Sequence, residues 1–459
     1  FIYGGSILPG KFKGKDVTIV DVFEGVGKHS TGLMSKKDLD ELESLACPSA
    51  GSCGGQFTAN TMACVSEAIG LALPGSAGTP AVYESRDKFA ISSGEAVMNL
   101  LKNNIRPRDI VTKKSLENAA VIVAASGGST NAALHLPAIA NEAGIKFTLE
   151  DVTNISKRTP YIADLKPGGK FVAKDLYEIG GVPILIKALL DGGLLHSDCL
   201  TVTGKTIAEN HKSINFPTDQ KIIYTTSKPL SPTGGFAGLK GNLAPDGAIV
   251  KVAGLKRKTF TGKAKCFDDE ESALNAVLNK KIKAGDVIVI RYEGPKGSPG
   301  MPEMLDSTSR ITTLCRQQGI VVGLMTDARF SGGSVGLVIG HVGPEAALGG
   351  AIALVEDGDE IIVDLNINEL NCTELSDITA FSKRKLSWEG TVELNGGAHP
   401  FVGLADTRLL NRMRFSAVSA KLGGGMHPNR DLWVSEPREP IETDFVPTNK
   451  FRGDPEGDS

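Results

Sequence analysis

The feature that most constrains the fold is a change in hydrophobic pattern near residues 215–235. Before this point apolar residues recur with helical spacing, which predicts helices over 36–46, 58–72, 82–103 and 129–143. After it, short β-branched runs between Gly and Asp turns predict strands over 248–252, 286–291, 320–326, 336–339 and 360–363. We therefore predict an α/β protein with a helix-rich N-terminal α/β layered domain and a smaller β-barrel-like C-terminal domain.

The same pattern predicts where the chain divides. We place the N-terminal domain at 1–220, the β-barrel-like domain at 221–435 and a tail rich in Pro, Glu and Asp at 436–459. Within the first domain, β-branched residues in 17–23 predict an additional strand.

Composition excludes several classes of function. The net charge of −3 provides no basic field for nucleic acid or for an anionic membrane, and no apolar run reaches the roughly 18 residues that span a bilayer. The seven Cys contain no Cys-x-x-Cys pair, so neither a disulfide framework nor a self-contained zinc site is expected. Phosphate-binding, dinucleotide-binding and nucleophile-elbow motifs are also absent.

Cys53 lies in a Gly- and Ser-rich turn just before a predicted helix. The partial positive charge at a helix start stabilises a thiolate, and a Gly-rich turn lets that thiolate approach a metal cluster. A buried structural cysteine explains the position equally well. Cys47 and Cys64 are interpreted as structural.

Glu303 ends a loop that contains several Gly and Pro residues after a predicted strand. A carboxylate held in a rigid loop suits Mg²⁺, which commonly takes one or two protein carboxylates and keeps other positions for water or substrate. The alternative is an exposed surface Glu, which is the usual environment of this residue type.

Ser331 begins a Ser-Gly-Gly-Ser turn after another predicted strand. Such a turn can expose a hydroxyl together with backbone N–H groups that bind a carboxylate or an oxyanion. Nearby Arg329 could grip a substrate carboxylate in a forked pair, or it could pair structurally with Asp327. The predicted substrate-binding residues here are Arg329, Gly332, Gly333 and Ser334.

A second Gly-rich turn precedes the predicted helix at 129–143. Its backbone donors favour an anion, so we predict substrate contacts from Ser129, Thr130 and Asn131. His135 lies one turn later between two Leu residues and is interpreted as a core residue.

These segments resemble signature motifs of the dihydroxy-acid/6-phosphogluconate dehydratase family, and the resemblance covers about residues 1–420. The matching motifs lie at 3–10, 48–62, 203–206, 238–248, 294–304 and 326–334. The resemblance implies a hydro-lyase that converts the small-molecule substrates 2,3-dihydroxyisovalerate and 2,3-dihydroxy-3-methylvalerate to 2-keto acids in valine, isoleucine and leucine biosynthesis.

The resemblance also implies cofactors and roles. We expect an iron–sulfur cluster, 2Fe–2S rather than 4Fe–4S, with Cys53 as a ligand, and Mg²⁺ with Glu303 as a ligand. Ser331 is expected to be the catalytic base, acting as an alkoxide, which requires nearby cations. A homodimer is expected, with the site where domains and subunits meet.

Other implied ligands, namely two further Cys, an Asp and a modified Lys, precede Phe1 in the family, so we expect an upstream segment. Gln56 replaces the usual Met and Ala328 the usual Gly, which leaves open an inhibitor-tolerant paralogue. Similarity of the region at 165–170 to eukaryotic members predicts a mitochondrial matrix or plastid location.

Three other functions remain open. The first is a sugar-acid dehydratase of the gluconate type within the same family, although the apolar Phe330 beside Ser331 favours a methyl-bearing substrate. The second is a transferase that uses Cys53 as a nucleophile with a His, and the third is a non-catalytic homologue.

Overall fold

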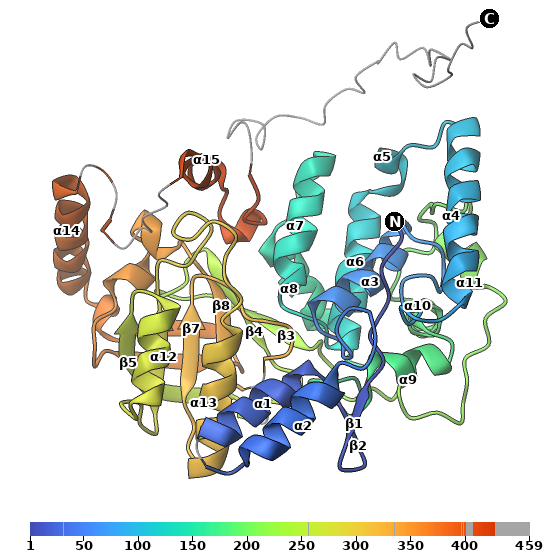
Figure 1. The fold of residues 1–459 in the computed structure, drawn as a ribbon. Helices are drawn as coiled ribbons and strands as arrows, with labels where there is room; N and C mark the ends of the chain where they lie inside the picture. The colour runs from blue at the N-terminus through green and yellow to red at the C-terminus, as the bar shows by residue number, and fades with distance from the viewer. Residues whose placement is uncertain are drawn as a thin grey trace, which may run out of the picture.

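The computed structural model describes residues 1–30, 32–255, 257–334, 336–395, 397, 399–400 and 407–426, except the side chains of 314 and 316–318. The predicted tail at 436–459 therefore lies outside the described residues. Figure 1 shows a helical part, coloured blue to green, beside a part built around a sheet, coloured yellow to red. This arrangement confirms the predicted fold class. The limits 1–220 and 221–435 stay predictions.

The helical part is organised around α6 (Lys113–Ser126), which is buried along almost its whole length. Thr112 caps its first turn through a bond from the Ser115 N–H to the Thr112 Oγ1 at 3.2 Å, and Gly127 ends it with a left-handed φ of 62°. Around α6 pack α3 (Thr58–Ile69), α7 (Ala132–Ala143), α8 (Leu149–Arg158) and α10 (Val182–Asp191).

Smaller elements complete this part. They are β1 (Gly10–Phe12), β2 (Lys15–Val17), α1 (Ile19–Ser30), α2 (Lys36–Ala46), α4 (Ser85–Lys102), α5 (Pro107–Ile110), α9 (Ala173–Glu178) and α11 (Ile207–His211). The predicted strand over 17–23 is wrong, because α1 begins there. The Asp21 carboxylate accepts the Thr18 N–H at 2.7 Å, which is a capping contact that starts a helix despite the β-branched sequence.

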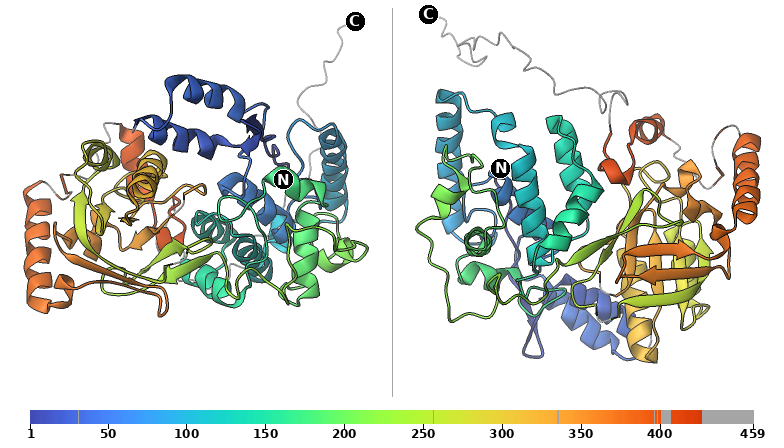
Figure 2. Two further views of the ribbon diagram at one scale, coloured as in Figure 1. Left: turned by 90° about the horizontal axis from the view of Figure 1, so that it is seen from below. Right: turned by 180° about the vertical axis from the view of Figure 1, so that it is seen from behind.

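The second part is an eight-stranded sheet with the order β10-β9-β5-β6-β7-β8-β4-β3. The strands are β3 (Phe236–Leu239), β4 (Gly247–Lys251), β5 (Thr259–Phe267), β6 (Asp286–Ile290), β7 (Gly323–Thr326), β8 (Val338–Gly343), β9 (Glu360–Asp364) and β10 (Glu369–Cys372). Strands β5 to β8 run parallel. The Leu370 N–H donates to the Lys240 carbonyl at 2.9 Å, so the two edge strands meet and the sheet nearly closes into a barrel (Figure 2).

Alternation along the strands separates two apolar layers. Val287 and Val289 of β6 point into the barrel, whereas Ile288 and Ile290 face α12 (Glu270–Leu278) and α13 (Leu305–Gln318). Peripheral helices α14 (Ile378–Leu394) and α15 (Arg408–Ser416) and four short 3₁₀ segments, at 346–348, 351–354, 374–376 and 420–422, follow.

The helical part and the sheet part are in contact along an interface, which we call the seam. Helix α8 packs on β3, and α1 crosses to α13, as Figure 1 shows below the sheet. Gly27 of α1 comes so close to α13 that a Cβ there would lie 2.5 Å from the Thr313 Oγ1. Among the described residues, no helix combines the length and apolar character needed to cross a bilayer.

Candidate active site

Four segments that are distant in sequence meet at this seam. The Asn131 Nδ2 donates to the Glu303 Oε1 at 2.7 Å, which joins the start of α7 to the loop before α13. The Ser331 N–H donates to the Glu303 carbonyl at 2.8 Å, which adds the turn after β7. Burial raises the pKa of the Cys53 thiol, and the charge of the nearby Glu303 raises it further, so Cys53 lies in the same region. The residues predicted to carry the chemistry therefore surround one place in the molecule.

Glu303 is held in a strained loop. Gly300, Met301 and Met304 have φ angles of 101°, 50° and 48°, which is rare for Met, and both Met side chains are buried. The Glu303 side chain is 36% exposed, and its Oε1 also accepts the Arg329 Nη1 at 3.1 Å. Buried Met anchors thus fix the backbone while the carboxylate remains accessible.

Arg329 serves this loop in the structure. Its Nε donates to the Met301 carbonyl at 2.6 Å, in addition to its contact with Glu303. The alternative pairing with Asp327 is wrong, because the fully buried Asp327 accepts backbone N–H groups instead, including that of Ala346 at 2.8 Å. Burial raises the pKa of Asp327 to about 6.

Asn131 provides an observation that points to a cation. Its Nδ2 is shared between Glu303 and the Thr58 Oγ1, the latter at 2.9 Å, and Thr58 in turn contacts the Ser129 Oγ at 2.9 Å. Its Oδ1 is buried and has no hydrogen-bond partner among the described residues. An unpaired amide oxygen beside a carboxylate is a ligand pair of the type that Mg²⁺ prefers. Thr130 is buried beside it.

The Ser331 turn is packed against the start of α3. A Cβ at Gly332 would lie 2.7 Å from the Thr58 backbone nitrogen, so only glycine fits without movement. The Ser334 N–H donates to the Ser331 carbonyl at 2.9 Å, while the buried Ser334 Oγ has no partner among the described residues. The Gly333 N–H reaches the Ser331 Oγ at 3.5 Å. Ser331 itself is half-buried.

Cys53 is half-buried, and the Asn60 Nδ2 holds its carbonyl at 2.6 Å. Burial raises the pKa of its thiol, and Glu303 adds to this effect, so the surrounding protein groups favour the thiol. A bound cation would reverse this effect. The expected stabilisation of the thiolate by α3 stays a prediction. Among the described residues, no His is a cause of the pKa shift of the Cys53 thiol.

The other two cysteines of this region differ from each other. Cys64 is buried and receives a hydrogen bond from the Gln56 Nε2 at 3.4 Å, so the Gln that replaces the usual Met acts inside the helical core. Cys47 is exposed.

Phe330, whose apolar side chain favoured a methyl-bearing substrate, packs in the layer between the sheet and α13, so that argument is wrong.

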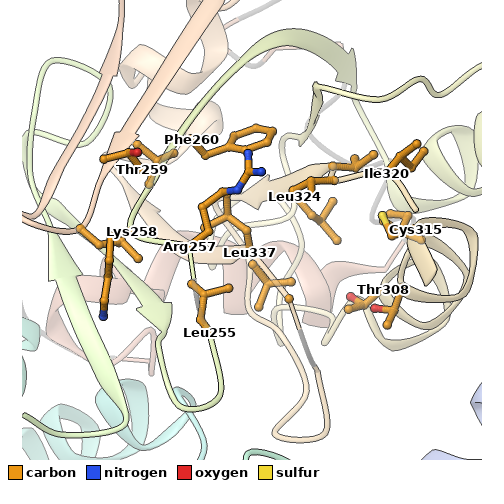
Figure 3. A pocket seen from close by; sticks show the side chains of 18 residues that line it. Leu255, Arg257, Lys258, Thr259, Phe260, Thr308, Cys315, Ile320, Leu324 and Leu337 are labelled. Atoms are coloured by element: carbon orange, nitrogen blue, oxygen red, sulfur yellow. The ribbon is translucent and has the colours of Figure 1, made fainter. Parts of the chain in front are cut away.

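Two other places do not coincide with this site. Asp359 and Cys372, which are buried, and the half-buried Glu374 have metal-ligand spacing, but Arg384 already pairs with Asp359 at 2.5 Å. A mostly apolar cavity of about 320 Å³ lies between the barrel and α13 (Figure 3), and none of the predicted site residues lines it.

The sequence did not identify two residues of the site. Thr58 bridges Ser129 and Asn131, and its place at the first position of α3 was the available signal. Lys251 ends an apolar strand, and its Nζ donates to the Gly332 carbonyl at 3.1 Å. Burial lowers the pKa of Lys251 to about 7.

The chain matches one protein family along most of its length and is similar to several bacterial proteins. Residues 1–210 match the dihydroxy-acid/6-phosphogluconate dehydratase N-terminal family, and residues 221–423 match the corresponding C-terminal family. A protein named dihydroxy-acid dehydratase from Parvibaculum lavamentivorans is 63% identical over 85% of this chain and 67% of its own length. One from Pelagibacter ubique is 68% identical over 81% of this chain and 64% of its own length. The chain thus spans about two thirds of these relatives.

These relatives correct one prediction. A third, dihydroxy-acid dehydratase 2 of Bradyrhizobium diazoefficiens, is 63% identical over 84% of this chain. All three organisms are bacteria, which have neither mitochondria nor plastids. The predicted mitochondrial or plastid location is therefore wrong.

Proposed function

Because the chain belongs to the dihydroxy-acid/6-phosphogluconate dehydratase family, we propose that the complete protein removes water from 2,3-dihydroxy acids to give 2-keto acids. Its substrates are 2,3-dihydroxyisovalerate and 2,3-dihydroxy-3-methylvalerate, in the synthesis of valine, isoleucine and leucine. The names of the relatives support this choice over gluconate-type acids.

The observation that carries the proposal is the convergence of Glu303, Asn131 and Ser331. A carboxylate, an unpaired buried amide oxygen and a hydroxyl in a glycine turn lie within a few hydrogen bonds of one another. Removal of the C2 proton and the C3 hydroxyl needs three groups close to the substrate: a metal ion that binds its carboxylate, a base that takes the proton, and a second Lewis acid that binds the departing hydroxyl.

The described residues include some of the ligands that each of the two expected cofactors needs. Glu303, with the Asn131 Oδ1 beside it, would hold Mg²⁺, and Cys53 would supply one thiolate of an iron–sulfur cluster, for which we expect the 2Fe–2S type. When bound, the two metal groups supply Lewis-acid stabilisation of the substrate's carboxylate and departing hydroxyl.

The chain's own groups perform the proton transfer. Ser331, as an alkoxide, would take the C2 proton at its Oγ. The Gly333 N–H and the side chains of Ser129 and Ser334, the latter with an Oγ that has no partner among the described residues, would orient the substrate carboxylate. Arg329 would hold the Glu303 loop in place and add positive charge.

We further expect a homodimer, which light scattering of the complete protein would test.

The direct test is an assay of complete protein purified without oxygen, with iron and Mg²⁺ measured in the same sample. We expect 2-keto acid from 2,3-dihydroxyisovalerate and much less from gluconate. Ser331→Ala should lower kcat by at least about 100-fold with iron content unchanged, since general-base contributions are of this size. Ser44→Ala is the matched control, because Ser44 is exposed on α2.

Cofactor roles need separate variants. Cys53→Ser should lose iron, whereas Cys47→Ser, at an exposed position, should retain it. Glu303→Gln should raise the Mg²⁺ concentration needed for half-maximal activity. Iron-loaded protein that forms no keto acid from 2,3-dihydroxyisovalerate would refute the proposed function.

A further inference from the structure

Lys251 occupies an unusual place at the end of β4. Along this strand Ala248 and Val250 point into the barrel core, so Ile249 and Lys251 point the other way. Ile249 joins the apolar core of the helical part. Lys251 therefore projects from the barrel into the seam, where it is only 6% exposed.

Among the described residues, the Lys251 amine is paired with a backbone carbonyl and not with a charged group. Its Nζ donates to the Gly332 carbonyl at 3.1 Å, and no carboxylate pairs with it among the described residues. Burial of an amine without a counter-ion costs several kcal/mol, so this position is expensive for stability. Such a cost is typical of residues that serve a site rather than the core.

The Gly332 carbonyl belongs to the turn that presents Ser331. That turn is attached at one side by the Ser331 N–H to the Glu303 carbonyl, and it lies directly on the backbone at Thr58. Gly332 and Gly333 contribute no side chains to hold it. Lys251 supplies the side-chain contact to the middle of the turn.

We propose that Lys251 is a positioning residue, which fixes the turn through the Gly332 carbonyl and so sets the direction of the Ser331 hydroxyl toward the reacting carbon. The inference rests on the proposed function and adds a residue to its machinery. Misplacement of a reacting group by about 1 Å can cost about 100-fold in rate, which sets the expected size of the effect.

The test compares Lys251→Met, which removes the donor, with Lys251→Arg, which retains donors and charge. In iron-loaded protein we expect Lys251→Met to lower kcat by about 100-fold with KM for 2,3-dihydroxyisovalerate changed less than about threefold. Lys251→Arg should recover at least about tenfold of that loss. Lys263→Met, at an exposed position of β5, is the matched control.

A second readout does not depend on turnover. Hydrogen exchange of the peptide containing 331–334 should be at least about tenfold faster in Lys251→Met than in the control, since the Ser334 N–H bond closes the turn. Unchanged kcat per iron-loaded site together with unchanged exchange would overturn the proposal. If Lys251→Met does not fold, the same comparison is made with Lys251→Gln, whose side chain is shorter than that of Lys. A reduced kcat with a wild-type KM in that variant supports the proposal, and wild-type kcat together with wild-type exchange overturns it.

The proposed function and the role of Lys251 can be refuted independently of each other. Wild-type protein that forms no keto acid defeats the proposed function, while faster exchange of 331–334 in Lys251→Met still supports the role of Lys251 in the turn. An active wild type with an equally active Lys251→Met, and with unchanged exchange of 331–334, defeats the role of Lys251 alone.

Discussion

Replacing Lys251 with Met should change how the stability of the protein depends on pH. The pKa of Lys251 falls from 10.5 in the unfolded chain to about 7 in the folded protein, because burial disfavours the charged amine. Between these two values the unfolded chain binds more protons, so the stability of the wild type rises as the pH rises from 7 to 10.5. Below pH 7 the full cost of the buried charge is present.

The magnitude follows from the shift. A difference of about 3.5 pKa units corresponds to about 5 kcal/mol, and about 2 kcal/mol of it is recovered between pH 7 and pH 9. Lys251→Met removes this titration, so its stability relative to the wild type should be about 2 kcal/mol greater at pH 7 than at pH 9. The lost bond to Gly332 contributes at both pH values and largely cancels in this difference.

Urea unfolding of wild type, Lys251→Met and Lys263→Met at both pH values measures this difference, with the slopes compared to verify that the unfolded states match. The exposed Lys263 should give almost no pH-dependent difference. A difference below about 0.5 kcal/mol for Lys251→Met would show that the amine is solvated or paired, and would refute the reasoning from burial.

Three further substitutions test other contacts. Gly332→Ala should cost about 1–3 kcal/mol and lower kcat, because its Cβ would meet the backbone at the start of α3; melting temperature and kinetics measure both effects. Gln56→Met should change stability by less than about 1.5 kcal/mol in urea unfolding and leave iron content unchanged. The Cys64 thiol is a weak acceptor, and the Ser126 hydroxyl, which accepts from the Gln56 Nε2 at 3.1 Å, keeps its bond to the Val123 carbonyl. Arg384→Met should cost about 3–5 kcal/mol in urea unfolding at pH 7, because it leaves the buried Asp359 carboxylate without its cation. That cost should shrink as the pH falls, since the folded pKa of Asp359 is lowered and its stabilising charge is lost in acid.

Local sequence patterns predicted much of the fold. The β-branched runs at 248–252 and 286–291 became β4 and β6, and the helical spacing at 36–46 became α2. The run at 17–23 failed because the capping contact of Asp21 outweighed β-propensity.

The site was predictable only in part, because its partners come from distant segments. The Gly-rich turns revealed Glu303 and Ser331, since rigid loops after strands display polar groups. Nothing local indicated that Arg329 would contact Glu303 rather than Asp327, or that Lys251 would be buried. Those facts depend on how the helical part docks on the barrel.

The contact between Gly27 and Thr313 also has a consequence for biosynthesis. Helix α1 leaves the ribosome about 290 residues before the surface of α13 that covers it. At about 5–20 residues per second, its partner arrives roughly 15–60 s later. During that interval the face of α1 is exposed to chaperones and to neighbouring nascent chains, so slower translation should lower the soluble yield.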